Sequence, residues 1–132
     1  MKKLVSIFFI VAVGFAIFSS CNKEDKAQTY QTYDVEYLLR NNLDQAKRFT
    51  ITYKNPAYAN KTTEQYENVE DTLWVRFEAR SLDLLYFAGR TKNDTADYSI
   101  FIYVDSELVG MDSTSCNWQC DSTFVEIEYP LP

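Results

Sequence analysis

Apolar and polar residues alternate along most of the chain after residue 32, in segments rich in Tyr, Phe, Val, Ile and Thr. This two-residue period is typical of β-strands with one buried face. In one segment Phe49, Ile51 and Tyr53 share a side, and in another Trp74 lies on the polar side, opposite the apolar residues. The pattern predicts strands over residues 33–39, 49–53, 66–69, 72–80, 84–88, 99–104, 107–111 and 123–129.

Short strands at this spacing predict how the domain is built. About seven to eight of them, each with one solvent-facing side, indicate a single Ig-like antiparallel β-sandwich. Asp105 and Ser106 are expected to form a hairpin turn, although neither is the Gly that such turns favour. Residues 55–65 carry one Pro and several small polar residues, which predicts a loop. We therefore expect one all-β domain over residues 33–132.

The N-terminal segment does not follow the alternation. Lys2 and Lys3 precede an apolar run over residues 4–18, which Ser19 and Ser20 follow. These are the three zones of a secretory signal. A run of this length makes about 22 Å of helix, whereas the hydrocarbon core of a bilayer is about 30 Å thick. The segment therefore favours a signal peptide over a permanent membrane span.

The stretch Phe18-Ser19-Ser20-Cys21 resembles the lipobox of bacterial lipoproteins, in which signal peptidase II cuts before a cysteine that carries a diacylglyceryl group. A thiolate is a suitable nucleophile for this lipid transfer. The resemblance implies that residues 1–20 are removed, that Cys21 is lipidated, and that residues 21–32 form a flexible tether. An ordinary cleaved signal followed by an incidental thiol is the alternative.

The residues after Cys21 point to a location. Asn22-Lys23-Glu24-Asp25 is similar to the acidic export signal of Bacteroidota surface lipoproteins. The similarity implies a protein anchored by lipid at the outer face of the outer membrane, since several acyl chains hold a protein firmly without a transmembrane helix. A solvated linker on a protein that stays at the periplasmic face is the alternative.

Charge and composition exclude several functions. Loss of Lys2 and Lys3 would leave 11 cationic against 19 anionic side chains, a formal charge of −8. Nucleic acid is therefore not an expected partner. The chain has no histidine and 3 glycines, which argues against hydrolytic triads and phosphate-binding loops. No cofactor is expected, and Asn93, Asp94 and Asp97 are interpreted as a solvated turn and not as a metal site.

The stretch "CNWQC" holds the other two cysteines, Cys116 and Cys120. In an oxidising compartment they are expected to form a structural disulfide; a redox motif or a zinc site would need other spacing or more ligands. Four extended residues span about 13 Å, whereas bridged Cα atoms lie about 4.4–6.8 Å apart, so the chain must turn sharply between them. Trp118 would sit at the tip of that turn.

Two tryptophans are candidate ligand contacts. Burial in the core is the expectation for Trp118, and display on a rigid loop, where it could contact a sugar or a protein, is the alternative. Trp74, on the predicted solvent-facing side of its strand beside Tyr66 or Tyr86, has the same two interpretations.

The order of the strand segments resembles the small exported β-sandwich proteins of the MmpS type. The resemblance covers most of residues 33–118 and rests on the segments "YDVEY", "RFTITYKNP", "EQYENVEDTLWVRFEA", "LDLLYFAGRTKND", "DYSIFIYVDSELV" and "DSTSCNW". In that family the domain is an accessory to membrane lipid or siderophore exporters. The family has a transmembrane helix where this chain has a predicted lipid anchor.

We therefore expect a lipid-anchored envelope protein without catalytic activity. It would act as a binding or accessory module of a cell-surface or periplasmic complex, with an envelope protein or a glycan as partner. The first alternative is an MmpS-like accessory of a membrane exporter. The second is a small glycan hydrolase that uses two of the 19 acids.

Overall fold

The structure, a computed structural model, describes residues 28–132 and consists of antiparallel β-strands. The predicted signal peptide, Cys21 and the tether up to residue 27 lie outside the described residues. The all-β prediction is confirmed. The strands are β1 (Thr32–Asn41), β2 (Lys47–Lys54), β3 (Thr62–Val69), β4 (Thr72–Arg80), β5 (Leu84–Val104) and β6 (Glu107–Pro130).

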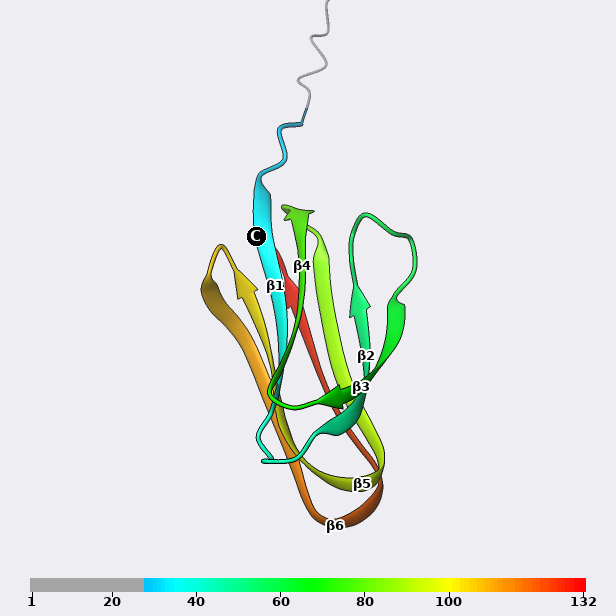
Figure 1. The fold of residues 1–132 in the computed structure, drawn as a ribbon. Helices are drawn as coiled ribbons and strands as arrows, with labels where there is room; N and C mark the ends of the chain where they lie inside the picture. The colour runs from blue at the N-terminus through cyan, green and yellow to red at the C-terminus, as the bar shows by residue number, and fades with distance from the viewer. Residues whose placement is uncertain (1–27) are drawn as a thin grey trace, which may run out of the picture.

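The sheet order is β3-β2-β5-β1-β4, with β6 paired to β5. Residues 86–90 of β5 pair with β2, and residues 98–104 of the same strand pair with β1. The β5–β6 hairpin therefore runs through both halves of the sheet and curls at its middle (Figure 1). The result is a sandwich in which the first layer contains β3, β2 and the early part of β5, and the second contains β4, β1 and the late part.

The number of strands differs from the prediction. Residues 84–88 and 99–104, predicted as two strands, are parts of the continuous β5, and residues 107–111 and 123–129 are parts of β6. Six strands thus replace the expected seven to eight. The polar segments at the middle of β5 and β6 resemble loops in sequence, but they stay paired with each other through the bend.

The predicted loop over residues 55–65 was too long, because β3 begins at Thr62. Residues 62–65 are all polar, so the alternation of apolar and polar residues that predicts a strand is absent there. They pair with β2 on one side, at the edge of the sheet, where few side chains need to be buried.

The predicted turn at Asp105 and Ser106 is confirmed. Both residues have positive φ angles, 49° and 67°, as a tight two-residue hairpin turn requires. The Asp105 carboxylate accepts a hydrogen bond of 2.8 Å from the backbone N–H of Asp34, and the backbone N–H of Asp105 donates one of 2.8 Å to the carbonyl of Asp34. These bonds to β1 compensate for the absence of glycine.

The core lies between the two layers. The ring of Tyr37 on β1 stacks on that of Phe87 on β5 with centroids 4.9 Å apart, and Phe49 on β2 meets Tyr98 edge-on at 5.1 Å. The start of β1 and the C-terminus lie at one end of the sandwich, whereas the bend of β5 and β6 lies at the other (Figure 1). Residues 28–132 contain no helix long and apolar enough to cross a bilayer.

Candidate functional site

The predicted disulfide between Cys116 and Cys120 is present, with Cα atoms 6.4 Å apart. It lies at the bend of the hairpin, where Cys116 pairs with Ala96 and Cys120 with Asp94. One residue of β5 therefore faces three residues of β6, and the two extra residues form a bulge. This bulge supplies the sharp turn that the spacing required.

Trp118 is at the centre of the bulge and is 83% exposed. The expected burial of Trp118 in the core is therefore wrong. The disulfide holds Cys116 inward as a buried residue, which leaves the three intervening residues outside the line of the strand. The indole is displayed at the end of the sandwich opposite the start of β1.

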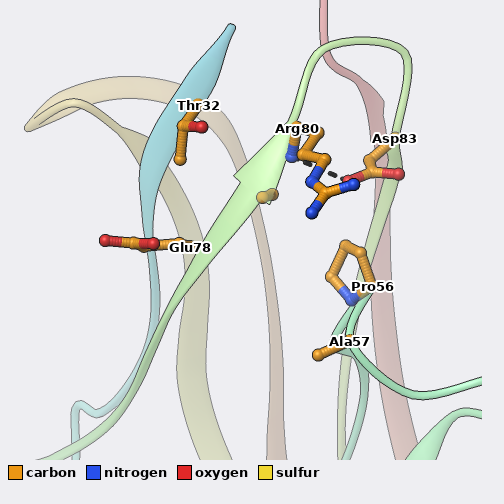
Figure 2. Close-up of a pocket in the computed structure, with 7 residues that line it drawn as sticks. Thr32, Pro56, Ala57, Glu78, Arg80 and Asp83 are labelled. Atoms are coloured by element: carbon orange, nitrogen blue, oxygen red, sulfur yellow. Dashed lines mark hydrogen bonds between the residues drawn. The ribbon is translucent and has the colours of Figure 1, made fainter. Parts of the chain in front are cut away.

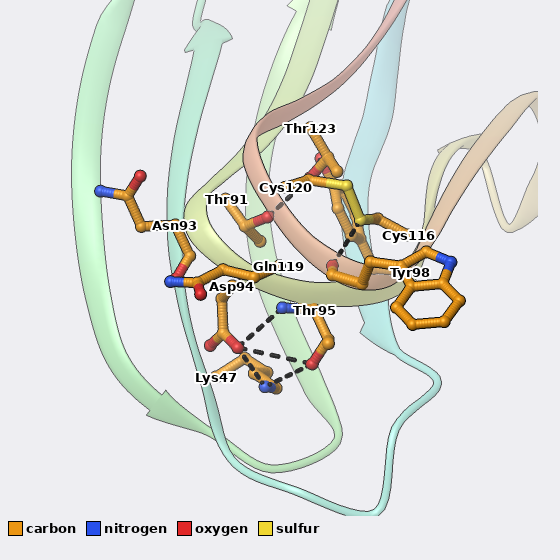
Figure 3. The surroundings of a disulfide bond; sticks show 11 residues. Lys47, Thr91, Asn93, Asp94, Thr95, Tyr98, Cys116, Gln119, Cys120 and Thr123 are labelled. Atoms are coloured by element: carbon orange, nitrogen blue, oxygen red, sulfur yellow. Dashed lines mark hydrogen bonds and ion pairs between the residues drawn. A yellow bond between two sulfur atoms is a disulfide. The ribbon is translucent and has the colours of Figure 1, made fainter.

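A buried lysine, Lys47, binds side chains at the bend of β5. The side chain of Lys47 at the start of β2 is only 7% exposed, and its ammonium lies 2.8 Å from the carboxylate of Asp94 and 3.1 Å from the hydroxyl of Thr95 (Figure 3). The hydrogen bond from Lys47 lowers the pKa of Asp94. The ion pair joins β2 to the part of β5 that faces the disulfide.

The acids at the bend do not gather into a metal site. Asp94 is engaged by Lys47, whereas Asp97 accepts a hydrogen bond of 2.8 Å from the side chain of Asn42. Asn93, in the left-handed region at φ 54°, marks the bend of β5. Within residues 28–132 no group of three or more acids or cysteines is arranged to hold a metal ion.

A second exposed surface lies on the outer side of the second layer. Leu38 of β1 pairs with Trp74 of β4 and with Phe101 of β5, and Phe101 pairs with Met111 of β6. These four residues form an apolar row across four strands. With Tyr103 and Leu108, which pair in the next row, they form the surface that we call the aromatic face.

The aromatic face is open to solvent at its margins and closed at its centre. Trp74 is 43% exposed and Met111 is 61% exposed, whereas Leu38 between the aromatic side chains is 1% exposed. The ring of Tyr103 lies 6.3 Å from those of Trp74 and Phe101, tilted by 34° and 27°. The rings thus lie roughly side by side on a rigid sheet.

Two arginines border the rings. The guanidinium of Arg40 lies 5.4 Å from the centre of the Phe101 ring, and that of Arg76 lies 5.0 Å from the Trp74 ring. Arg76 is also 3.4 Å from the carboxylate of Glu36. These cation–π contacts hold both guanidinium groups beside the apolar row, where they can bind carboxylates or carbonyl oxygens of a partner.

The predicted neighbours of Trp74 were wrong. Tyr66 and Tyr86 belong to the first layer, where Tyr66 hydrogen-bonds to Glu64 and Tyr86 to Glu126. The bond to Glu64 raises the pKa of Tyr66 to about 12, and burial, followed by the bond to Glu126, raises that of Tyr86 to about 12. The neighbouring ring of Trp74 is that of Tyr103, and among residues 28–132 no ring contact joins Trp74 to Trp118.

A polar hollow of about 430 Å³ lies near the start of β1. Figure 2 shows Arg80 and Asp83 on one side of it and Pro56 and Ala57 below, while the carboxylate of Glu78 points away from Asp83. The backbone N–H of Arg80 donates a hydrogen bond of 2.7 Å to Asp83. This hollow therefore does not bring two carboxylates together on a common substrate position.

Sequence reasoning found Trp74 but missed most of the aromatic face. Phe101, Tyr103 and Met111 belong to predicted strands, and their alternation with Ile100 and Ile102 places Phe101 and Tyr103 on the outer side. The signal that could have found them is the presence of large apolar residues at positions that alternation assigns to solvent.

No protein-family model matches the chain, and no curated protein is significantly similar to it.

Proposed function

We propose that the chain is a binding module without catalytic activity, anchored at the outer face of the outer membrane through lipid on Cys21, that docks another envelope protein through its aromatic face. The observation that carries the proposal is the apolar row of Trp74, Leu38, Phe101 and Met111, in which the exposed side chains of Trp74 and Met111 lie at the two ends and Leu38 is buried between them. Large apolar side chains exposed together on one face mark interaction sites.

The composition of the face favours a protein partner. Trp, Tyr, Phe, Met and Arg are the residues enriched where protein surfaces meet. Trp74 and Met111 provide apolar side chains at the two ends of the row, and Arg40 and Arg76 provide charged groups at its border. Because the rings stand on paired strands, little conformational freedom is lost on binding.

The anchor is tested by metabolic labelling of producing cells with an alkyne fatty acid. The wild-type protein should be labelled and Cys21→Ser should not. Protease added to intact cells should then remove the wild-type domain if it lies at the surface. An unlabelled wild-type protein would contradict the anchor, and a labelled but protected protein would place it at the periplasmic face.

The partner is tested by photo-crosslinking. A photoreactive amino acid replaces Met111 in one strain and Trp118 in another, and intact cells are irradiated before purification and mass spectrometry. We expect a protein adduct at position 111 and none at position 118. An adduct at position 118 alone would move the contact to the disulfide bulge, and an exporter subunit in the adduct would support the MmpS-like role.

Two tryptophan variants provide a matched comparison. Each of Trp74→Ala and Trp118→Ala removes one exposed indole. Trp74→Ala should reduce the amount of crosslinked partner at least about tenfold, as expected for an interface hot spot, while Trp118→Ala should leave it unchanged. Equal recovery with both variants would contradict docking through the aromatic face.

A further inference from the structure

Positive charge gathers in one hollow of this acidic protein. The hollow, of about 520 Å³, lies on the outer side of the first layer. It is lined by the cations Lys47, Arg48, Arg90 and Lys92 and by the acids Glu67 and Asp94. We call it the basic groove. Cations outnumber acids there, whereas acids outnumber cations in the chain, 19 to 13.

Two of the four cations are already paired. Lys47 lies 2.8 Å from Asp94, at the end of the groove near the disulfide (Figure 3), and Arg48 lies 2.6 Å from Glu67. Among residues 28–132, Arg90 and Lys92 form no ion pair. Arg90 and Lys92 are therefore the two cations of the groove without an ion-pair partner among the described residues.

Arg90 and Lys92 are placed to act together. Both are exposed on the same side of β5, two residues apart, which separates their Cα atoms by about 7 Å. The guanidinium of Arg90 lies 5.3 Å from the ring of Phe124 on β6, which orients it on the sheet. A polymer with anionic groups at intervals could meet both cations at once.

The groove continues along the sheet into a second hollow of about 370 Å³, since Thr50 and Arg90 line both. This part carries the hydroxyls of Thr52 and Thr63 and the exposed ring of Phe124. Hydroxyls bond to sugar hydroxyl groups, and an aromatic face packs against the apolar face of a sugar ring. Cations, hydroxyls and a ring thus line one continuous surface.

We infer that the basic groove binds an anionic polysaccharide, one that carries carboxylate or sulfate groups on its sugars. Arg90 and Lys92 bind the anionic groups, the threonines bond to hydroxyls, and Phe124 packs against a sugar ring. The site lies on the opposite layer from the aromatic face and does not depend on the proposed protein partner.

The test is affinity electrophoresis of the full-length protein in detergent, in gels that contain polygalacturonate, dextran sulfate or neutral dextran. We expect retardation by polygalacturonate, by dextran sulfate or by both, which distinguishes carboxylate from sulfate recognition, and none by neutral dextran. Retardation should fall as salt is added. The double variant Arg90→Gln and Lys92→Gln should weaken binding at least about tenfold.

The control is the double variant Lys54→Gln and Arg80→Gln, which removes the same charge from two positions that line neither hollow of the groove and do not belong to the aromatic face. It should bind both polymers as the wild type does. The inference is overturned if this control loses as much affinity as the groove variant, if neither anionic polymer retards the wild type, or if neutral dextran retards it equally. Stronger retardation by single-stranded DNA than by either glycan would also overturn it.

Discussion

The hydroxyl of Tyr98 donates a hydrogen bond of 3.0 Å to the carbonyl oxygen of Gly89, although both residues belong to the strand β5. The strand curls so far in nine residues that its two halves face each other across the core. A Cβ atom at position 89 would lie 3.0 Å from the Tyr98 ring and 3.1 Å from Leu39. A side chain at position 89 would therefore have to displace buried neighbours, which glycine does not.

Gly89→Ala should destabilise the domain by about 1–3 kcal/mol, because the added methyl group overpacks a buried contact. Urea denaturation followed by tryptophan fluorescence measures the change. In the background of Tyr98→Leu, which removes the ring, the same substitution should cost clearly less. Equal costs in the two backgrounds would show that the Tyr98 ring does not set the space at Gly89.

Removal of the disulfide should have a modest effect. The double variant Cys116→Ala and Cys120→Ala should lose about 2 kcal/mol of unfolding free energy, since the closed ring is small. The reduced wild type should show the same loss in urea denaturation. After alkylation of the native protein without reductant, mass spectrometry should find neither Cys116 nor Cys120 alkylated. Alkylation of both would contradict the structure.

The Lys47–Asp94 pair should make stability depend on acid pH. The pKa of Asp94 is lowered, chiefly by the hydrogen bond from Lys47. A carboxyl group with a lowered folded pKa stabilises the fold above its unfolded pKa, about 3.9, and this contribution is lost as pH falls through the folded value.

The wild type should therefore have a free energy of unfolding about 1 kcal/mol higher than that of Asp94→Asn near neutral pH. The expected difference is small because the Asp94 carboxylate is partly exposed to solvent. The difference should shrink as pH falls below about 4. Urea denaturation between pH 7 and 2 would measure it. Glu67→Gln, at the exposed pair with Arg48, is the control and should change stability little. A difference for Asp94→Asn that stays constant to the lowest pH would refute the pairing.

Ser106→Gly should stabilise the hairpin by about 0.5 kcal/mol, because Ser106 has a φ of 67° and glycine adopts this region without steric cost. Asp105→Gly is the contrast. Glycine would also adopt the positive φ of Asp105 without steric cost, but the substitution removes the hydrogen bond from Asp34 to the Asp105 carboxylate. Asp105→Gly should therefore not stabilise the hairpin. The midpoint of thermal unfolding distinguishes the two variants, and a higher midpoint for Asp105→Gly would contradict this account.

The alternation of apolar and polar residues was sufficient to predict a strand that has one buried and one solvent-exposed side. The bounds predicted for residues 72–80 agree with β4, and Trp74 faces solvent as its position in the alternation predicted. Alternation made no prediction at Trp118, whose expected burial came from its residue type. A bulge interrupts the two-residue period there, so the side of the strand on which Trp118 lies cannot be counted from its neighbours.

The sequence by itself determined that the domain is all-β, where most strands lie, that Asp105 and Ser106 turn the chain, and that Cys116 and Cys120 are close enough to bond. These features depend on neighbours in the chain, through side-chain period, turn geometry and short loop closure. Tertiary structure decided which strands are neighbours. Pairing between residues distant in sequence joined Trp74, Leu38, Phe101 and Met111 into one row, gathered Arg48, Arg90 and Lys92 in one groove, and bent β5 and β6 through both layers. A period of two residues states which side chains share a face, but it carries no information about the strand that lies beside it.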